Sequence, residues 1–224
     1  KAIEYHQKHL AIAKTIGYRS SVGNALNNLG VTYYEQGKFS LAESLLREGI
    51  KVRESLRNSE LKDSDKVSFF DTQSNIYRTL QEVLIAQNKT DAALEISERG
   101  RARAFVESLA SRLYTNNKQV DKSPSPPTIT QIKQIAKSQN STLVQYSILY
   151  DTFEIAGKQK TKESELYIWV IKPTGEVTFR KVDLKPLWQK ENTTLSELVS
   201  TTRKSLGGSD DERSIFDVKV KNPV

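Results

Sequence analysis

Histidine and cysteine, which often carry proton transfer and nucleophilic attack in enzymes, are scarce or absent in this 224-residue chain. Cysteine is absent, which excludes thiolate chemistry, disulfide bonds and zinc sites built on sulfur. The only histidines, His6 and His9, lie in one helix-periodic segment with no nucleophile beside them in the sequence. We therefore interpret both as ordinary helix-face residues rather than catalytic groups.

Phosphate-binding and metal-binding patterns are also missing from the sequence. Gly207-Gly208 lacks the lysine and the preceding strand of a phosphate-binding loop. No set of His, Asp and Glu residues has metal-ligand spacing, and the consecutive Asp210, Asp211 and Glu212 are typical of a solvated turn. We predict no catalytic residue, no metal and no cofactor for this chain.

The formal net charge of +7 raises the possibility of a nucleic-acid partner. The densest basic cluster, however, is interleaved with acidic residues and has no aromatic residues arranged to stack on bases. This pattern favours a solvated helix face, with nucleic-acid binding through the same helix left as a weaker alternative. The basic residues of the cluster are Arg99, Arg101, Arg103 and Arg112, and the acidic ones are Glu95, Glu98 and Glu107.

Targeting signals and membrane segments are not evident. No apolar run approaches the roughly 20 residues needed to span a bilayer. Lys1 leads directly into polar sequence without a secretory signal pattern. With cysteine absent, which suits a reducing compartment, we predict a cytoplasmic location and no membrane partner.

The elements that must position any binding residues repeat along the chain. Two pairs of similar residues lie 40 positions apart, Ala2 with Ala42 and Leu10 with Ile50. Three further pairs share a separation of 51, namely Leu29 with Leu80, Ala42 with Ala93 and Gly49 with Gly100. A constant separation at several positions indicates an internal repeat. The separation of 51 is longer than the separation of 40, and we assign the additional residues to a loop insertion near Leu56–Lys66.

The middle copy reads as two antiparallel helices. Leu26, Leu29 and Tyr33 form one apolar stripe, and Gly30 on that stripe allows a second helix to approach closely. Gln36-Gly37-Lys38 predicts a turn, because glycine readily adopts the conformation that ends a helix. The second helix is marked by small and apolar residues at Phe39, Ala42, Leu45, Leu46 and Gly49.

Leu26-x-x-Leu29-Gly30-x-x-Tyr33 followed by Ala42-x-x-x-Leu46 resembles the tetratricopeptide repeat, although the usual tryptophan and terminal proline are missing. An unrelated helical bundle is the alternative. The third copy is more degenerate, since Gln81 replaces the glycine of the first helix. The first copy begins at the second helix of its pair, so we expect Ile3 and Leu10 to be exposed and the chain to be part of a longer protein.

The resemblance implies a superhelix whose concave side is lined by the first helix of each pair and receives a partner peptide or helix. Asparagine amides suit contacts with a peptide backbone, and Arg78 could pair with a carboxylate. The alternative is that these side chains are merely solvated. The groove positions that the resemblance implies are Asn24, Asn27, Val31, Tyr34, Glu35, Asn75, Arg78, Glu82 and Ile85.

The composition changes after Leu113, and residues 114–127 read as a proline-bearing linker. Capping boxes begin helices at Thr128 and Thr194, with Gln131 and Glu197 as their partners. Between these helices we predict three antiparallel strands and a polar loop, with a turn at residues 172–175. The predicted strands are Thr142–Tyr150, Glu165–Ile171 and Glu176–Val182, and the predicted loop is Gly157–Lys162. The predicted fold class is α+β, with an all-α repeat superhelix at residues 1–113.

The junction ALEISERGRARAF (residues 93–105), the linker, the short helix and the strand TLVQY together resemble the start of a CHAT domain. CHAT domains are caspase-like domains attached to tetratricopeptide arrays, and residues 128–224 would be the leading part of one. The resemblance implies a non-catalytic scaffold that binds a protein or peptide partner. It also implies an alternative, the targeting half of a cysteine endopeptidase whose His–Cys dyad lies downstream of this chain.

Overall fold

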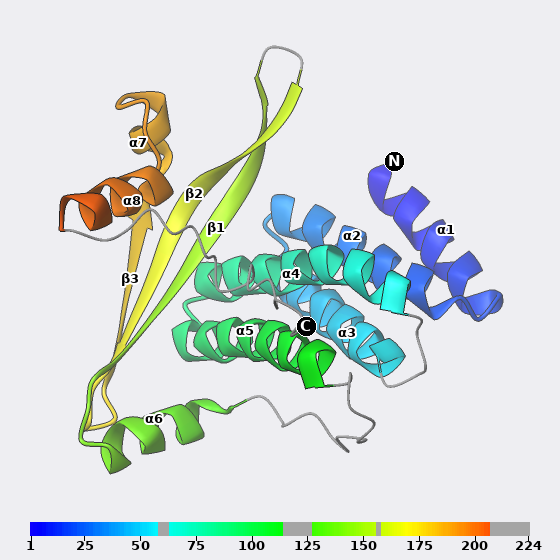
Figure 1. The fold of residues 1–224 in the computed structure, drawn as a ribbon. Helices are drawn as coiled ribbons and strands as arrows, with labels where there is room; N and C mark the ends of the chain where they lie inside the picture. The colour runs from blue at the N-terminus through cyan, green and yellow to red at the C-terminus, as the bar shows by residue number, and fades with distance from the viewer. Residues whose placement is uncertain (58–62, 114–126, 156–157, 207–224) are drawn as a thin grey trace, which may run out of the picture. The chain divides into compact units, whose positions relative to one another are not determined.

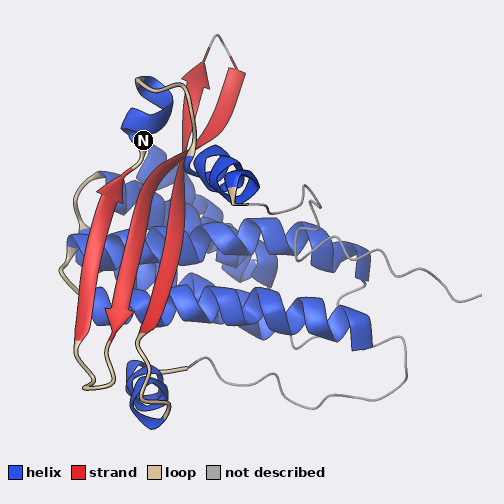
Figure 2. Ribbon diagram, turned by 60° about the vertical axis from the view of Figure 1, so that its left-hand side comes forward, coloured by secondary structure: helices blue, strands red, loops and turns tan. Residues whose placement is uncertain are grey.

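The computed structural model describes residues 1–57, 63–113, 127–155 and 158–206 (Figure 1). Figure 2 shows these residues as a group of helices and an antiparallel sheet, which confirms the predicted α+β class. One compact unit contains residues 1–141 with 172–177, and the other contains residues 142–171 and those from 178 onward. Residues 114–126 of the predicted linker lie outside the described residues.

The first unit consists of helices that pair with their neighbours in sequence. They are α1 (Ala2–Thr15), α2 (Arg19–Glu35), α3 (Phe39–Arg57), α4 (Asp63–Ala86), α5 (Thr90–Leu113) and α6 (Ile129–Ser138). The pairs α2–α3 and α4–α5 are the two successive helical hairpins that the repeat predicts.

The turns inside the two hairpins have the same geometry. Gly37 ends α2 with φ of 71°, and Asn88, which lies 51 residues later, ends α4 with φ of 58°. The amide of Lys38 donates to the Tyr33 carbonyl at 2.9 Å, and Lys89 donates to Leu84 at 2.9 Å. A residue in the left-handed region thus closes each first helix, as the predicted turn at residues 36–38 requires.

Glycines allow the paired helices to approach closely. A Cβ atom on Gly30 of α2 would lie 2.6 Å from Cγ of Leu46 on α3, a side chain that is fully buried. A Cβ atom on Gly49 of α3 would lie 2.8 Å from Cδ1 of Ile76 on α4. Gly30 therefore serves contact within a hairpin, as predicted, and Gly49 serves contact between successive hairpins.

Two expectations about the repeat region are wrong. The predicted insertion near Leu56–Lys66 is not only a loop, because α3 extends to Arg57 and α4 already begins at Asp63. Leu10 is not exposed but packs against a core formed by Ala13, Val22 and Leu26, and Ile3 is half-buried. The exposed apolar residues of α1 are others, among them Tyr5 and Ile12.

The second unit is a three-stranded sheet with two helices. The strands are β1 (Leu143–Ile155), β2 (Lys158–Ile171) and β3 (Val177–Asp183), in the order β1-β2-β3. β1 pairs with β2 antiparallel along its whole length, with an irregularity at Leu149 and Tyr150. The predicted polar loop is wrong for residues 158–162, which extend β2, while residue 157 is outside the part that the structure describes. The turn at 172–175 is confirmed, with Gly175 at φ of 86°.

Two helices follow the sheet, α7 (Lys185–Gln189) and α8 (Leu195–Ser205). The predicted capping boxes at Thr128 and Thr194 are both present and begin α6 and α8. α8 ends at Ser205, and Gly207 and Gly208 are not among the described residues. α7 is not among the predicted elements. None of the described helices combines the length and the apolar character that crossing a bilayer requires.

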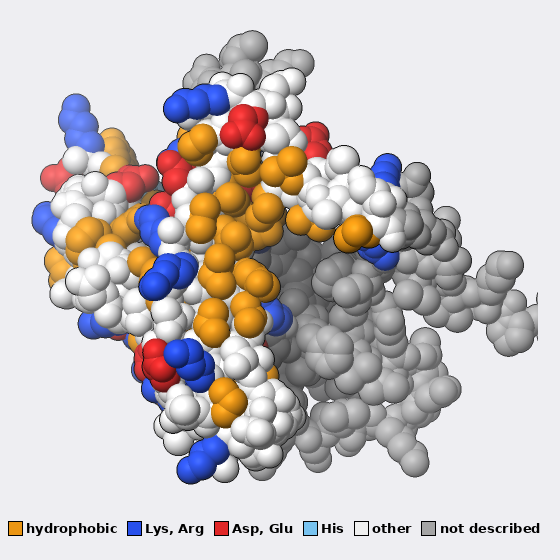
Figure 3. Space-filling view, turned by 90° about the vertical axis from the view of Figure 1, so that its left-hand side faces the viewer, with side chains coloured by type: hydrophobic (Ala, Val, Ile, Leu, Met, Phe, Trp, Pro, Cys, Tyr) orange, Lys and Arg blue, Asp and Glu red, His pale blue; other side chains and the backbone are white. Residues whose placement is uncertain are grey.

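An aromatic cluster lies on one face of the sheet. The ring centroids of Trp169 and Phe179 are 5.1 Å apart, and those of Tyr167 and Phe179 are 5.5 Å apart. Exposed apolar side chains also occur in this unit, at Val144, Tyr146 and Tyr150 on β1 and at Val182 on β3. In the view of Figure 3, apolar side chains gather in a band.

Candidate functional site

The predicted groove residues come from the first helices of the two hairpins, α2 and α4, which also contact each other. Asn24, Asn27, Val31, Tyr34 and Glu35 lie on α2. Asn75, Arg78, Glu82 and Ile85 lie on α4. Leu26 and Leu29, two apolar residues of α2, are buried, whereas the polar residues of α2 lie on other faces of the helix.

Asn24 and Asn75 are exposed, and each side chain accepts a hydrogen bond from an arginine. Asn24 Oδ1 accepts from Arg53 Nη2 on α3 at 2.9 Å. Asn75 Oδ1 accepts from Arg78 Nη1 at 3.4 Å. The two asparagines are 51 residues apart and therefore occupy equivalent positions of the repeat. With the oxygen held by an arginine, the amide NH2 group of each remains a hydrogen-bond donor.

Arg53 was not among the predicted site residues. Its side chain is 5% exposed and lies against Gly23, where a Cβ atom would come within 3.1 Å of Arg53 Cγ. Burial lowers the pKa of the Arg53 guanidinium below its usual value. Asn24 and Arg53 are 29 residues apart in sequence, so only the helical hairpin brings them together.

The other predicted residues of α2 have varied environments. The Oδ1 atom of Asn27 is buried and makes no hydrogen bond within the described residues. Val31 and Tyr34 are half-buried, and the Tyr34 ring lies 6.0 Å from that of Phe39 at the start of α3. Glu35 is exposed. Asn27 is therefore a weaker candidate for binding a peptide than Asn24, because its side chain would have to rotate before the buried Oδ1 atom could reach a guest.

On α4 the predicted residues lie on the more accessible side of the helix. Arg78, Glu82 and Ile85 are half-buried, whereas neighbouring Leu80 and Val83 are fully buried. Half-buried and fully buried residues thus lie on different faces of α4, as expected for an amphipathic helix. Arg78 carries a positive charge next to the Asn75 amide, which together offer donors to a carboxylate or a carbonyl.

A carboxylate on α3 ties the two hairpins together. Glu54 accepts hydrogen bonds from Tyr77 Oη at 2.9 Å and from Arg99 Nε at 2.8 Å, and Arg99 Nη2 also pairs with it. The hydrogen bonds to Glu54 raise the pKa of Arg99 above its usual value. Arg99 of the predicted arginine cluster therefore has a structural role in holding α3, α4 and α5.

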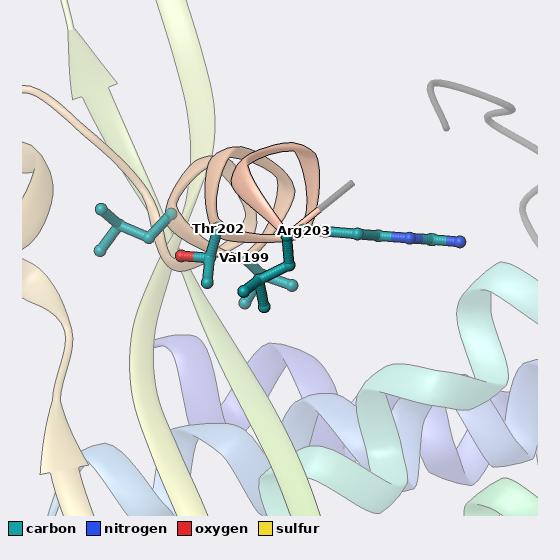
Figure 4. A pocket seen from close by; sticks show the side chains of 5 residues that line it. Val199, Thr202 and Arg203 are labelled. Atoms are coloured by element: carbon teal, nitrogen blue, oxygen red, sulfur yellow. The ribbon is translucent and has the colours of Figure 1, made fainter. Parts of the chain in front are cut away.

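The described residues also include a histidine contact and one pocket outside the α2–α4 face. His9 Nε2 lies 2.6 Å from Ser21 Oγ, a contact between α1 and α2. No group of three or more His, Asp or Glu side chains in the described ranges could hold a metal ion. A pocket on α8 is lined mainly by apolar side chains, and Figure 4 shows Arg203 extending away from the helix there. The pocket residues are Leu198, Val199, Thr202, Arg203 and Leu206.

Comparison with known proteins agrees with the helical hairpins. Residues 1–55 match the family model described as tetratricopeptide repeat. Tetratricopeptide repeat protein 28 of Mus musculus is 30% identical over 198 residues, which cover 86% of this chain and 8% of that protein. Its Homo sapiens counterpart is 29% identical over 197 residues, which cover 85% of this chain and 8% of that protein. The chain thus spans about 8% of the length of these relatives.

No solved structure gives a significant match. The family match and the two hairpins support the tetratricopeptide interpretation of the N-terminal region. The resemblance to CHAT domains stays a prediction, as does the assignment of the individual groove residues.

Proposed function

We propose that the tetratricopeptide repeat region of this chain is a non-catalytic protein-interaction module that holds a partner peptide or helix along α2 and α4. The observation that carries the proposal is the pair of equivalent amides, Asn24 and Asn75, each oriented by an arginine. Because the two asparagines are one repeat apart, their NH2 groups can donate hydrogen bonds to backbone carbonyls at two points along an extended guest.

The chemistry of this face suits a guest that is recognised chiefly through its main chain. Amide donors do not discriminate between side chains, whereas Arg78 and Glu35 add charged contacts at two places. Val31 and Ile85 provide limited apolar area. The guest would therefore be a segment with backbone carbonyls free to accept and with a carboxylate that reaches Arg78.

The proposal is tested by removing the donors without changing the shape of the side chains. In the double variant Asn24→Asp and Asn75→Asp, both NH2 groups are lost while the oxygens that bind the arginines remain. Peptides selected from a random phage-displayed library on the wild-type protein should bind the double variant at least about tenfold more weakly. The variant should remain folded, because Arg53 and Arg78 would then face carboxylates.

Gln134→Glu on α6 is the matched control, since it makes the same amide-to-acid change at an exposed position away from α2 and α4. Its affinity for the selected peptides should equal that of the wild type. Unchanged binding by the double variant, measured by fluorescence anisotropy, would show that the asparagines do not hold the guest. Selection of no peptides that bind the wild-type protein would count against the module itself.

We further infer that residues 128–224 are related to the leading part of a CHAT domain. The antiparallel strands and the helix that precedes them support this relation. A working peptidase is not proposed for this chain, because its sequence contains no cysteine. The alternative of a targeting half of an endopeptidase shares the same peptide-binding step and makes the same prediction for the asparagine variant.

A further inference from the structure

β1 and β2 continue as a two-stranded ribbon beyond the part of the sheet that contains β3. β2 has 14 residues and pairs with β1 from Lys158 to Ile171, whereas β3 has 7 residues. Figure 1 shows the far ends of β1 and β2 extending past β3. The chain then leaves β3, the amide of Leu184 donates to the Ser164 carbonyl of β2 at 2.9 Å, and α7 begins. α7 therefore lies beside β2, which it contacts.

One face of this ribbon carries lysines together with an aromatic residue. Phe153 of β1 lies opposite Lys160 of β2 in the register, and Asp151 lies opposite Lys162. Residues that are directly opposite in an antiparallel pair project from the same face, as do residues two positions apart in one strand. These four side chains therefore share a face. Lys185 of α7 joins them, because its Nζ atom pairs with Oδ2 of Asp151 at 3.1 Å.

The lysines of the ribbon are not neutralised by the carboxylates around them. Asp151 and Glu165 each pair with a different lysine, one from α7 and one from β3. Lys160 is exposed and Lys162 is half-buried, and neither is in an ion pair with any residue that the structure describes. These two ammonium groups thus keep positive charge that the phosphate groups of a ligand would neutralise.

Two aromatic rings lie next to these lysines. The ring centroids of Phe153 and Trp188 are 4.9 Å apart, with an interplanar angle of 55°. Lys185 Nζ lies 5.9 Å from the centroid of the Phe153 ring. Trp188 Nε1 donates to the main-chain oxygen of Glu163 at 2.8 Å, which fixes the orientation of the indole. Both rings are half-buried, so each keeps an accessible part against which a further ring can stack.

We propose that this basic and aromatic face of the ribbon binds single-stranded nucleic acid. The lysines contact the phosphates and an unpaired base stacks on the rings, a combination that binds single strands with little sequence preference. The bases of a duplex are already stacked on each other, and an acidic peptide would leave the rings without a stacking partner. The site shares no residue with the α2–α4 face and goes beyond the proposed function. Its residues are Phe153, Lys160, Lys162, Lys185 and Trp188.

The test measures binding of a fluorescently labelled thymidine oligonucleotide of about 15 nucleotides to the full chain by anisotropy. The wild type should bind saturably at low salt, and the logarithm of its affinity should fall linearly with the logarithm of the salt concentration. The double variant Lys160→Gln and Lys162→Gln should bind at least about tenfold more weakly at about 0.1 M salt. Its salt slope should be smaller by about 1.4, which is about 0.7 for each lost phosphate contact.

A second variant tests the rings separately from the charges. Phe153→Leu keeps an apolar side chain but removes the ring, so binding should weaken at least about fivefold while the salt slope stays the same. Unlabelled oligonucleotide should also quench the tryptophan emission of the wild type. That quenching reports on Trp188, because Trp169, the other tryptophan, is fully buried.

The matched control for the lysine variant is Lys8→Gln with Lys51→Gln. Both lysines are exposed and lie on α1 and α3 of the first unit. This control has the same net charge as the ribbon variant and should bind the oligonucleotide with wild-type affinity. A difference between the two double variants therefore depends on where the lysines lie and not on the total charge of the chain.

Four results would overturn the proposal. The wild type could fail to bind the oligonucleotide at low salt, or the ribbon variant could bind it as tightly as the control variant. Poly-glutamate could compete as effectively as the oligonucleotide, which would assign the face to an acidic protein. A duplex of the same length could bind as tightly without quenching Trp188, which would show that the rings do not stack on bases.

Discussion

Glu43 and Glu98 are two carboxylates of the repeat region whose surroundings shift their pKa values in opposite directions. Glu43 of α3 receives hydrogen bonds from Lys89 Nζ at 2.7 Å, from Arg47 Nε at 2.9 Å and from Gln87 Nε2 at 2.9 Å. Burial raises the pKa of Glu43, but these three partners outweigh it and lower the pKa overall. Burial raises the pKa of Glu98 on α5, and Arg101 offsets this only in part.

These opposite shifts predict opposite effects of neutralisation. The folded state favours the charged form of Glu43, so its contribution is present above the unfolded pKa and is lost as pH falls through the folded pKa. Glu43→Gln should lower the free energy of unfolding by about 1–2 kcal/mol at neutral pH. The difference from the wild type should shrink below about pH 4, as measured by urea unfolding across a pH series.

Glu98 is expected to behave in the reverse way. The folded state favours its protonated form, so its charge becomes a cost as pH rises through the folded pKa. Glu98→Gln should raise the free energy of unfolding by up to about 1 kcal/mol at neutral pH, with no gain near about pH 4. A loss of stability at neutral pH would show that the pair with Arg101, at 3.6 Å, outweighs the burial of Glu98.

At the scale of helices, the approach of α2 to α3 depends on the missing side chain at Gly30. Gly30→Ala should destabilise the chain by about 1–3 kcal/mol, because the new methyl group collides with the buried Leu46. Gly100 is the matched control, since a Cβ atom there would lie 3.3 Å from the nearest Tyr77 atom. Gly100→Ala should cost less than about 1 kcal/mol, as the helix propensity of alanine offsets the contact. Equal losses in urea unfolding would contradict this account.

α8 is held at its N-terminus by a buried side chain of β2. Glu163 Oε2 accepts from the amide of Leu195 at 2.7 Å, and Oε1 accepts from Ser196 at 3.3 Å. The main-chain oxygen of Glu163 also accepts from Trp188 Nε1 at 2.8 Å. α8 itself contributes no buried residue, so this anchor and the Thr194 capping box fix where the helix begins.

Removing that anchor should loosen α8 selectively. Glu163→Ala leaves two N-terminal amides without their acceptor, at a cost of about 1–2 kcal/mol. Amide hydrogens of residues 195–205 should exchange faster, as followed by mass spectrometry. Glu197→Gln should exchange at nearly the wild-type rate, because glutamine also completes a capping box. Slow exchange in Glu163→Ala would show that other contacts hold the helix.

Local sequence signals were sufficient for the starts of α6 and α8 and for the turns at Gly37 and Gly175. The capping boxes at Thr128 and Thr194 depend on residues three positions apart, and Gly37 acts within one turn. The first part of β2 was missed because Lys158–Lys162 has no apolar alternation, and its pairing with β1 supplies the order. The anchors Arg53 and Glu163 were missed because their partners are 29 and 32 residues away.

For the whole molecule, the first unit should fold without the second. α6 belongs to that unit, because the amide of Ile129 donates to Glu95 Oε1 at 2.6 Å and Lys133 pairs with Asp91 at 3.1 Å. A fragment of residues 1–141 should show a helical spectrum and cooperative unfolding in urea. A fragment of residues 1–127 should be less stable by about 1–2 kcal/mol, because Glu95 and Asp91 lose their partners. Equal stability of the two fragments would exclude a contribution from α6.

The element pairs with the most extensive contacts are neighbours along the chain, from α1 with α2 to α4 with α5 and then β1 with β2. Each pair closes only a short loop, so little chain entropy is lost before its contacts form. Folding can therefore keep pace with synthesis, and the first helices can assemble while the ribosome is still producing the strands.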